Sequence, residues 1–372
     1  MCARGYFFED FDVGRLFRHA TPRTLSSGDV ALYIALTGAR QPLHCSAPLA
    51  RAFGHDIPPI DDVLLFNMAF GKTVPDISAN AVANLGYADV RFLKAAYPGD
   101  TIRAETEVIG ARETSSGESG VVYVRSTAFN QRGAPVLTWI RWVLVRKRDR
   151  SAPAREALVP ELPSIVTPGS IVLPSKSMEA AAHVEASGST RFWDDYQVGD
   201  RIDHPAGMTV DESDHTLATK LYQNNSKVHF DALAMAATPH GRRLVYGGHV
   251  ISVCRALSYD GLENVVAILA INGGSHRAPT FAGDTLYCYS EVIERIEVGG
   301  RNDCGLLRLR LVGLSNVSPY GFEPLVDEGG KPHFRPEVVL DLDYTVLMPR
   351  ASAGPATQGV EDDQDTPGTS SV

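Results

Sequence analysis

The sequence lacks the features that mark several large protein classes. Its five cysteines include no CxxC pair and no zinc-ligand spacing, and their odd number argues against a disulfide framework. No apolar run approaches the roughly 20 residues that span a bilayer, and the N-terminus has no apolar signal-peptide core. We therefore expect a cytoplasmic protein with reduced thiols and no membrane partner.

Positive charge is also scarce. The chain has 35 Lys and Arg against 44 Asp and Glu, a net charge of −9, which argues against nucleic acid as a partner. No Walker lysine follows its Gly-Asp-Thr segments and no cluster of metal ligands stands out, so we expect no phosphate loop, no metal and no cofactor. What the chain does have is 372 residues, 44 % of them apolar, which suits two domains with their own cores.

The chain reads as a tandem duplication. Moving back by 185 positions places His229 on His44 and Asp214 on Asp29. The flanking sequences match too, with the offset slipping by one downstream: 193–199 (WDDYQVG) lies over 8–14 (FEDFDVG), and 282–286 (AGDTL) lies over 98–102 (PGDTI). Chance matches rarely hold register over such a length, so the two halves should share one fold.

The sequence pattern of each half predicts short helices followed by antiparallel strands. The apolar runs 63–70 and 250–260 favour a central helix, and alternation in 121–129 and 137–145 favours strands. The expected strands are 85–92, 100–113, 121–130 and 136–146 in the first half, and 265–272, 285–298, 306–316 and 338–348 in the second. A helix followed by meandering strands is typical of the α+β class.

Composition sets the domain boundaries. We divide the chain into a first domain (1–148), a linker (149–189), a second domain (190–350) and a tail (351–372). The linker is rich in Pro, Ser and Ala, so we expect it to be extended and partly wrapped on the surface. The tail is acidic and of low complexity, which predicts disorder.

The second half has a chemically rich break between two helices. Leu217, Leu221 and Tyr222 have the i, i+4, i+5 spacing of a buried helical face. A polar loop, 223–227, follows, and a second apolar-periodic run begins at 228. The helical face should therefore end at this loop, and the loop should lie at a cleft.

The residues of this break suggest proton transfer. Asn224 and His229 should meet at the cleft, and Gly247 and Gly248, at the head of the next helix, could expose backbone N–H groups there. An imidazole, a carboxamide and a turn rich in donors are the components of a proton-transfer site with an oxyanion hole.

The loop sequences resemble those of MaoC-type R-specific enoyl-CoA hydratases, whose fingerprint is Gly-Asp-x-Asn-Pro-aliphatic-His. The first half has GARQPLH at 38–44 and the second has QNNSKVH at 223–229, so Ala39 and Asn224 stand where that family has Asp. The likeness covers roughly 6–147 and 191–349. It implies a tandem (double) hot-dog fold, in which a central helix is wrapped by an antiparallel sheet in each half.

Two further stretches are similar to the mesaconyl-CoA hydratase (β-methylmalyl-CoA dehydratase) subfamily. They are 80–92 (NAVANLGYADVRF) and 222–230 (YQNNSKVHF). This resemblance implies reversible hydration of a branched dicarboxylic enoyl-CoA, with an acyl-CoA thioester as the partner and no metal. Itaconyl-CoA or another enoyl-CoA is the alternative substrate.

The resemblance also assigns roles. Because the amide of Asn224 cannot take a proton, His229 becomes the expected general base, and the backbone of Gly247 and Gly248 would polarise the thioester. His44 is either a second catalytic residue or a residue that shapes the acyl pocket, and Asp61 and Asp62 stand where the second half has its glycines. The expected substrate-binding residues are Arg40, Lys227, Arg91 and Tyr222, the first three as cationic partners for a substrate carboxylate.

Alternatives to this reading stay open at the level of sequence. Both histidines could merely cap broken helices, and Gly247 and Gly248 could serve only close helix packing. The absence of the family aspartate from both loops supports the alternative of a non-catalytic acyl-CoA-binding protein or a subunit of a heteromeric hydratase. Because one half keeps Asn224, His229 and the glycine pair together, we expect an enzyme, a hydro-lyase. A homodimer is possible, and the direction and stereochemistry of the reaction are not readable.

Overall fold

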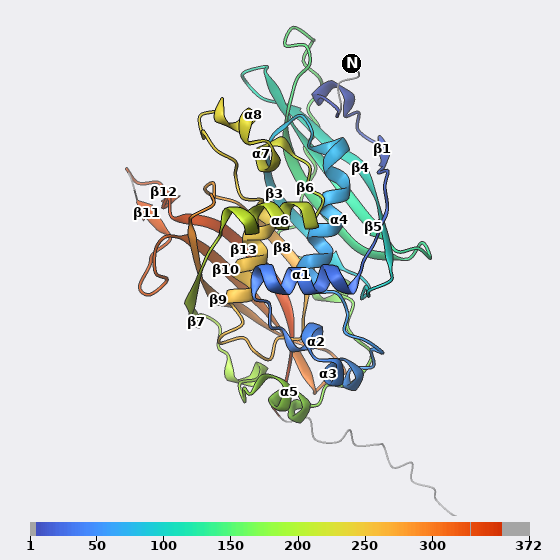
Figure 1. Ribbon diagram of the computed structural model, residues 1–372, viewed down its shortest axis with the longest axis vertical. Helices are drawn as coiled ribbons and strands as arrows, with labels where there is room; N and C mark the ends of the chain where they lie inside the picture. The colour runs from blue at the N-terminus through green and yellow to red at the C-terminus, as the bar shows by residue number, and fades with distance from the viewer. Residues whose placement is uncertain (1–4, 328, 352–372) are drawn as a thin grey trace, which may run out of the picture.

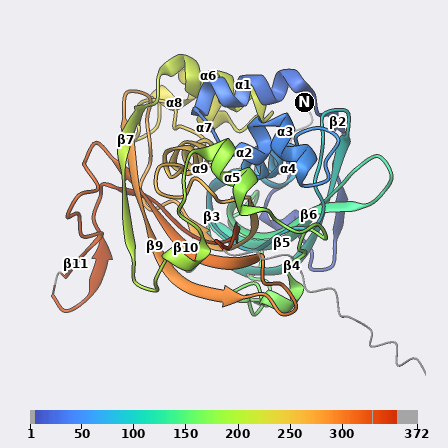
Figure 2. The same ribbon diagram turned by 90° about the horizontal axis from the view of Figure 1, so that it is seen from below.

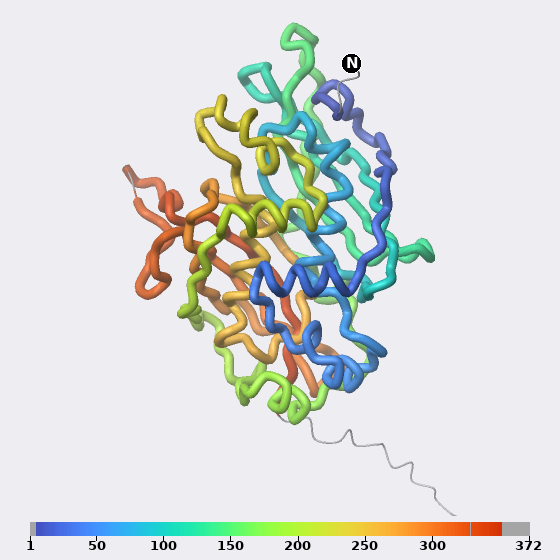
Figure 3. The backbone as a smooth tube through the Cα atoms, viewed as in Figure 1, coloured from blue at the N-terminus to red at the C-terminus, as the bar shows by residue number. Residues whose placement is uncertain are grey.

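The computed structural model describes residues 5–327 and 329–351. Of the predicted tail only Ala351 falls within these ranges, so the prediction of disorder lies outside the described residues. Figure 3 traces the chain through two units that follow one another and lie side by side.

The first half folds as helices followed by four long strands, as predicted. Its helices are η1 (Phe8–Asp10), α1 (Ser27–Thr37), α2 (Pro42–Cys45), α3 (Ala47–Ala52) and α4 (Asp62–Ile77), and its strands are β1 (Leu16–Arg18), β2 (Arg23–Thr24), β3 (Ala81–Phe92), β4 (Thr101–Glu113), β5 (Ser119–Phe129) and β6 (Pro135–Arg146). The sequence pattern does not predict the two short strands β1 and β2, which precede α1. A capping box starts α1, because the Ser26 hydroxyl accepts from the Asp29 amide and the Asp29 carboxylate accepts from the Ser26 amide.

The linker and the second half follow the same plan. The linker contains η2 (Pro168–Ser170) and α5 (Ala180–Ser187), and the second half contains η3 (Trp193–Asp195), β7 (Arg201–Thr209), α6 (Glu212–Leu221), α7 (Lys227–Phe230), α8 (Ala232–Ala236), α9 (Gly247–Leu257), β8 (Ala267–Ser275), β9 (Thr285–Glu297), β10 (Cys304–Ser315), β11 (Leu325–Asp327), β12 (Pro332–Phe334) and β13 (Val338–Pro349). Between β10 and β13 the chain forms the small β11–β12 hairpin.

The two halves form one antiparallel sheet. Within the described residues its strand order is β1-β4-β5-β6-β3-β8-β13-β10-β9-β7. The halves join where β3 pairs with β8, with Tyr87 opposite Gly274 and Arg91 opposite Ala270. The sheet curves around α4 and α9, and α1 and α6 lie on its open side (Figures 1 and 2). This is the predicted α+β, double hot-dog arrangement.

The core is shared between the halves. Phe66 and Trp139 of the first half belong to the same apolar cluster as Ile251 and Leu309 of the second, and all four are fully buried. Burial of each such side chain contributes about 1.5–3 kcal/mol. Because α4 also packs directly against α9, neither half can be removed without exposing this cluster.

The duplication predicted from the sequence extends to individual hydrogen bonds. His19 in the first half bonds Thr106 through Nε2 (2.7 Å), and its counterpart His204 bonds Ser290 in the same way (2.9 Å). The hydroxyls of Thr24 and Thr101 are 2.8 Å apart, as are those of Thr209 and Thr285. The two halves therefore share their fold and its internal contacts.

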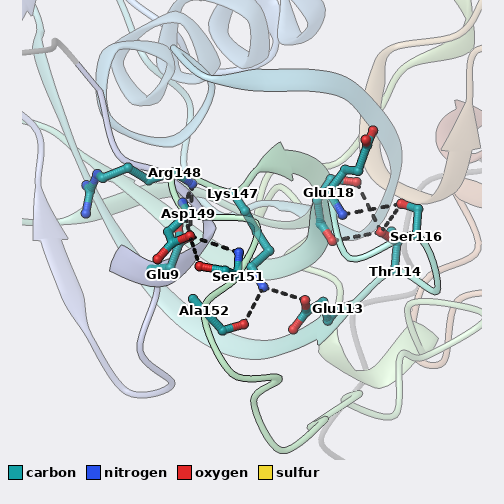
Figure 4. Close-up of polar contacts among 11 residues, drawn as sticks. Glu9, Glu113, Thr114, Ser116, Glu118, Lys147, Arg148, Asp149, Ser151 and Ala152 are labelled. Carbon is teal, nitrogen blue, oxygen red and sulfur yellow. Dashed lines mark hydrogen bonds and ion pairs between the residues drawn. The ribbon is translucent and has the colours of Figure 1, made fainter.

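Polar contacts anchor the start of the linker to the first half (Figure 4). The buried ammonium of Lys147 donates to Glu113 (2.6 Å) and to the carbonyl of Ala152 (3.0 Å). The Glu9 carboxylate accepts from the amides of Arg148 (2.9 Å) and Asp149 (3.0 Å). These bonds direct the chain away from β6 and back along the first half.

The structure corrects two expectations. Leu217 is 42 % exposed, because the buried face of α6 consists of His215, Ala218, Thr219 and Leu221 and continues to Tyr222. Leu221 and Tyr222 are thus buried as predicted, and Leu217 lies at the edge of this face. The linker is not wholly extended, since α5 lies within it and His183 of α5 is buried against Phe53.

The cysteines and the helix lengths can be compared with the expectations of reduced thiols and no membrane span. The four cysteines in the described ranges, Cys45, Cys254, Cys288 and Cys304, are free thiols. No helix in the described part of the chain is long and apolar enough to cross a bilayer.

The packing of α4 predicts the effect of one methyl group. A Cβ added to Gly71 would lie 1.8 Å from the carbonyl oxygen of Tyr222, a backbone atom that cannot move independently. We expect Gly71→Ala to lower the free energy of unfolding by about 1–3 kcal/mol through overpacking, measured by denaturant unfolding.

Gly28→Ala is the matched control. Gly28 also lies in a helix, but its added Cβ meets only Ser26 Oγ at 3.5 Å. There we expect no loss, or a gain of up to about 1 kcal/mol from the less flexible unfolded chain. Equal effects of the two substitutions would contradict the proposed close contact.

Candidate functional site

Two histidines occupy equivalent places in the halves. His44 lies on α2 and His229 on α7. Each has its Nδ1 beside a backbone carbonyl, at 3.1 Å from Pro59 for His44 and at 2.9 Å from Leu244 for His229. Because a carbonyl only accepts, each Nδ1 carries the hydrogen, and each Nε2 is left for other work.

His229 opens onto a cavity lined by both halves. This cavity, here called the His229 cavity, has a volume of about 390 Å³. Residues of both halves line it, among them Phe70, Asn84, Tyr87, Arg141, Asn224, Ser226, His229, His240, Tyr246, Gly247, His276 and Arg277. No carboxylate is among the lining residues, so nothing in the wall competes with a ligand for His229 Nε2.

His44 faces a smaller cavity with different chemistry. The His44 cavity has a volume of about 280 Å³, and residues 172–174 of the linker and 266–269 form part of its wall. Here Nε2 lies 3.7 Å from the carboxylate of Asp62, which also accepts from the amide of Ile268 at 2.8 Å. The nitrogen that is free in His229 is therefore held by an acid in His44.

These surroundings shift the pKa values of the two imidazoles in opposite directions. Burial lowers the pKa of His229 to about 4, only partly offset by its bond to Leu244. Burial also acts to lower the pKa of His44, but the neighbouring carboxylate of Asp62, together with the charge of Asp61, outweighs it and raises that pKa to about 9. At neutral pH His229 is an uncharged base and His44 is a cation.

The N-termini of α4 and α9 also differ, because an acid occupies the amides of the first and no side chain of the described residues occupies those of the second. In α4 the side chain of Asp61 accepts from the amides of Val63 (2.9 Å) and Leu64 (3.1 Å). The position before α9 that is equivalent to Asp61 holds Tyr246, not a glycine as expected from the sequence, and the Tyr246 side chain makes no capping hydrogen bond. The amides of Gly247 and Gly248 consequently have no acceptor among the described residues. Free amides at a helix N-terminus are suited to bind an oxyanion.

Both glycines are also required by packing. A Cβ on Gly247 would lie 2.4 Å from the ring of His276, and one on Gly248 would lie 1.9 Å from Asn67 Oδ1. Gly247 lines the His229 cavity, whereas Gly248 is buried and is not among the residues that line it. Close packing and free amides therefore coexist at this helix end.

Asn224 is held at the cavity wall by a local turn. It is buried, and its Oδ1 accepts from the amide of Ser226 at 3.1 Å, which leaves Nδ2 without a partner in the described ranges. The preceding Gln223 has a left-handed φ of 53°, and Gly38 repeats this with a φ of 67° in the first half. Both loops thus turn in the same way, although the first half presents only buried Ala39.

The predicted cationic partners lie elsewhere. Arg40 is paired with Asp260 (3.0 Å) and stacks on Tyr259, and Arg91 is paired with Asp89 (2.6 Å). Lys227 is exposed and makes no ion pair with the described residues. None of the three lines the His229 cavity. Arg40 is held by an acid distant in sequence, and Arg91 is held by an acid on its own strand.

Tyr222 does not line the cavity either. Its side chain is fully buried behind the wall, with its hydroxyl 3.4 Å from Ser252 Oγ and its ring against Tyr246. It supports Tyr246 rather than contacting the cavity itself.

Sequence reasoning missed several polar residues of the wall, above all Arg141, Asn84, Tyr246 and His276. A signal for Arg141 was present. In β6 the side chains of Trp139, Arg141 and Val143 alternate on the buried face, so an arginine falls where the strand pattern calls for an apolar residue.

The opposite charge states of the two histidines can be measured directly. Nitrogen-detected NMR at pH 7 should find the His229 ring neutral with its hydrogen on Nδ1, and the His44 ring doubly protonated. Asp62→Asn should lower the pKa of His44 and leave that of His229 unchanged. Titration of both rings near the ordinary value of about 6.5 would contradict this assignment.

Comparison with known proteins places the chain among hydratases. The family model for mesaconyl-CoA hydratase matches residues 2–158. The β-methylmalyl-CoA dehydratase of Chloroflexus aurantiacus is 49 % identical over 93 % of this chain and 97 % of its own, and the mesaconyl-CoA hydratase of Cereibacter sphaeroides is 50 % identical over 93 % and 98 %.

Solved structures agree in fold. A MaoC domain dehydratase from Chloroflexus aurantiacus superposes with a TM-score of 0.89 at 50 % identity, covering 93 % of this chain and 98 % of that one. A Mycobacterium tuberculosis protein with a double hotdog fold gives 0.73 at 26 % identity, covering 92 % and 98 %. The chain therefore belongs to the mesaconyl-CoA hydratase family, within the MaoC-like double hot-dog proteins.

Proposed function

We propose that this protein catalyses the reversible hydration of mesaconyl-CoA to β-methylmalyl-CoA in the His229 cavity. The observation that carries the proposal is the asymmetry between the halves, since only the second half has an uncharged imidazole beside free helix amides in a roomy cavity. Near 50 % identity to relatives with these named activities supports the choice of substrate.

The proposed reaction begins with a bound water. Asn224 orients the water through its free Nδ2, and His229 Nε2 takes one of its protons while the oxygen bonds to the β-carbon of the enoyl thioester. The electron pair of the double bond moves toward the thioester carbonyl, whose oxygen becomes an enolate. His229 is the base because the cavity wall contains no carboxylate.

The developing oxyanion is received at the N-terminus of α9. The free amides of Gly247 and Gly248 donate to it, and one such donor typically contributes about 3–4 kcal/mol to transition-state stabilisation. The imidazolium of His229 then returns its proton to the α-carbon, which completes the addition of water and restores the neutral ring. Dehydration runs through the same steps in reverse.

The first half serves this site without repeating its chemistry. His44 is charged, its Nε2 is held by Asp62, and Asp61 occupies the amides of α4. We therefore propose a structural role for His44. We also propose a cytoplasmic location, which the free thiols support.

Loss of the conjugated enoyl-thioester absorbance of mesaconyl-CoA tests the proposed reaction. We expect wild-type activity and a fall in kcat of about 10²–10⁴-fold in His229→Ala, because a general base contributes that much. His44→Ala is the matched control and should retain turnover wherever it remains folded. Activity that survives His229→Ala but not His44→Ala would place the site in the first half, and binding without any turnover would favour a non-catalytic acyl-CoA-binding protein.

The pKa of His229 predicts an acid-shifted pH profile. The base must be neutral, so kcat/KM should stay level from about pH 8 to about pH 5 and fall only as the pH approaches the pKa of about 4. A decline centred near 6.5, the ordinary histidine value, would contradict the proposal.

Unfolding must be separated from this effect. The folded-state pKa of His229 lies below its unfolded value, so the unfolded chain binds more protons between about pH 6.5 and the pKa of about 4, and stability falls as the pH falls through that window. Circular dichroism recorded at each pH distinguishes loss of fold from protonation of the base.

A further inference from the structure

The free carboxylate of the acyl group would have to be bound close to His229. The inference rests on the proposed function, because in a malyl thioester the carbon that carries the hydroxyl also carries the free carboxylate. The carbon attacked by water and the carboxylate are thus one bond apart, and the cation that recognises the carboxylate must line the same cavity. Arg40, Lys227 and Arg91 do not.

Two arginines line the His229 cavity, and only one lacks an acid. Arg277 is paired with Asp341 at 3.2 Å and stacks on Phe334. Arg141 is fully buried in β6 and forms no ion pair with any carboxylate in the described ranges. A buried guanidinium without an anion is costly to keep.

The partners of Arg141 are neutral and incomplete. Its two terminal nitrogens donate to Ser78 Oγ (3.0 Å) and Thr73 Oγ1 (2.9 Å), and its Cζ lies 4.2 Å from the centre of the Phe70 ring. Its Nε makes no hydrogen bond. These contacts hold the fork in place against α4, and they leave the Nε donor without an acceptor and the positive charge without a carboxylate.

Other orphaned polar groups surround it in the same wall. Both amide atoms of Asn84 and the hydroxyl of Tyr246 are buried without a hydrogen-bond partner. Asn84 lies on β3 opposite Val143, two residues along β6 from Arg141. Buried polar groups are nearly always paired in native proteins, so three unpaired groups in one cavity indicate a ligand that pairs them.

Tyr246 links this cluster to the proposed catalytic residues. Its ring contacts that of His229, with centroids 5.5 Å apart, and that of Phe70, at 6.0 Å. Phe70 in turn carries the guanidinium of Arg141. His229 and Arg141 therefore lie on the same wall, separated by two aromatic rings.

The duplication gives a further argument. Arg141 pairs with Val124 in the sheet, and Tyr344 pairs with Leu309, the counterpart of Val124 in the second half. The position equivalent to Arg141 thus holds a neutral tyrosine. The cation is present only in the strand that lines the His229 cavity.

We propose that Arg141, with Asn84 and Tyr246 beside it, binds the free carboxylate of the acyl group and makes the site selective for dicarboxylic acyl-CoA thioesters. Burial lowers the pKa of Arg141 to about 10, which still leaves the group protonated at neutral pH. Arg141 thereby takes the role that the sequence assigned to Arg40, Lys227 or Arg91.

Binding of unreactive analogues tests the subsite without relying on turnover. Methylsuccinyl-CoA has the carboxylate and no double bond, and 2-methylbutyryl-CoA has a methyl group in place of the carboxylate. By calorimetry the wild type should bind methylsuccinyl-CoA more tightly. Arg141→Met should weaken that binding roughly 10- to 100-fold, the worth of hydrogen bonds to a charged group, and leave 2-methylbutyryl-CoA unchanged.

Kinetics give an independent readout. Tiglyl-CoA is mesaconyl-CoA with a methyl group in place of the carboxylate, so the ratio of kcat/KM between these two substrates isolates the carboxylate. Arg141→Met should lower this ratio by a similar factor. A purely structural role would lower kcat/KM for both substrates equally, and that result would overturn the proposal.

Control variants separate binding from folding. Arg125→Met changes an exposed arginine on the neighbouring strand β5. It should alter neither the preference for methylsuccinyl-CoA over 2-methylbutyryl-CoA nor the ratio of kcat/KM between mesaconyl-CoA and tiglyl-CoA. If Arg141→Met does not fold, Arg141→Lys replaces it, because lysine keeps the charge without the fork and should reduce the preference for the carboxylate. An unchanged preference in the lysine variant would overturn the proposal.

The wild type alone can also decide. Equal affinity for the two analogues would overturn the subsite with no variant needed. The wild type could also prefer methylsuccinyl-CoA, lose this preference in Arg141→Met and yet hydrate neither substrate. That result would support the subsite and overturn the proposed reaction.

Discussion

The close contact between the two central helices positions everything else in this protein. Asn67 of α4 is fully buried and donates from Nδ2 to the carbonyl of Gly248 and to Ser252 Oγ, both at 3.0 Å. These bonds cross from one half to the other and fix the first turn of α9. Because Gly248 has no side chain, Asn67 can approach that turn. The free amides at the head of α9 are therefore aimed by a residue of the opposite half.

The halves have diverged around a common framework. The bond from histidine Nδ1 to a backbone carbonyl and the left-handed turn before it are present in both. The halves differ at three positions near the histidine: the residue that caps the central helix (Asp61 or Tyr246), the first residue of that helix (Asp62 or Gly247) and one loop residue (Ala39 or Asn224). In the first half the two aspartates occupy the helix amides and the histidine Nε2. In the second half no acid among the described residues binds these groups, and the loop residue offers a side-chain amide. A few substitutions thus separate a structural site from one able to bind a ligand.

The sequence was sufficient to predict the fold, and insufficient to predict the wall of the cavity. Periodicity and the repeat at 185 residues located the central helices and most strands, because burial of one face imposes a period on the chain. The break containing Asn224 and His229 was predictable from neighbouring residues for the same reason. Arg40 could not be excluded, since its partner Asp260 is 220 positions away. Arg141 enters the cavity through pairing of β6 with β3, a contact between segments that no local pattern connects.

Residues 149–189, which join the halves covalently, permit an asymmetry that two identical subunits could not reach. In a symmetric dimer of one hot-dog chain, every substitution appears twice. A tyrosine that freed the helix amides of one site would free those of the other, and an acid that locked one histidine would lock both. Once the copies are parts of one polypeptide, Asp61 and Tyr246 can occupy equivalent positions in the same molecule. One copy can then specialise in scaffolding and the other in chemistry, each changing without altering its twin.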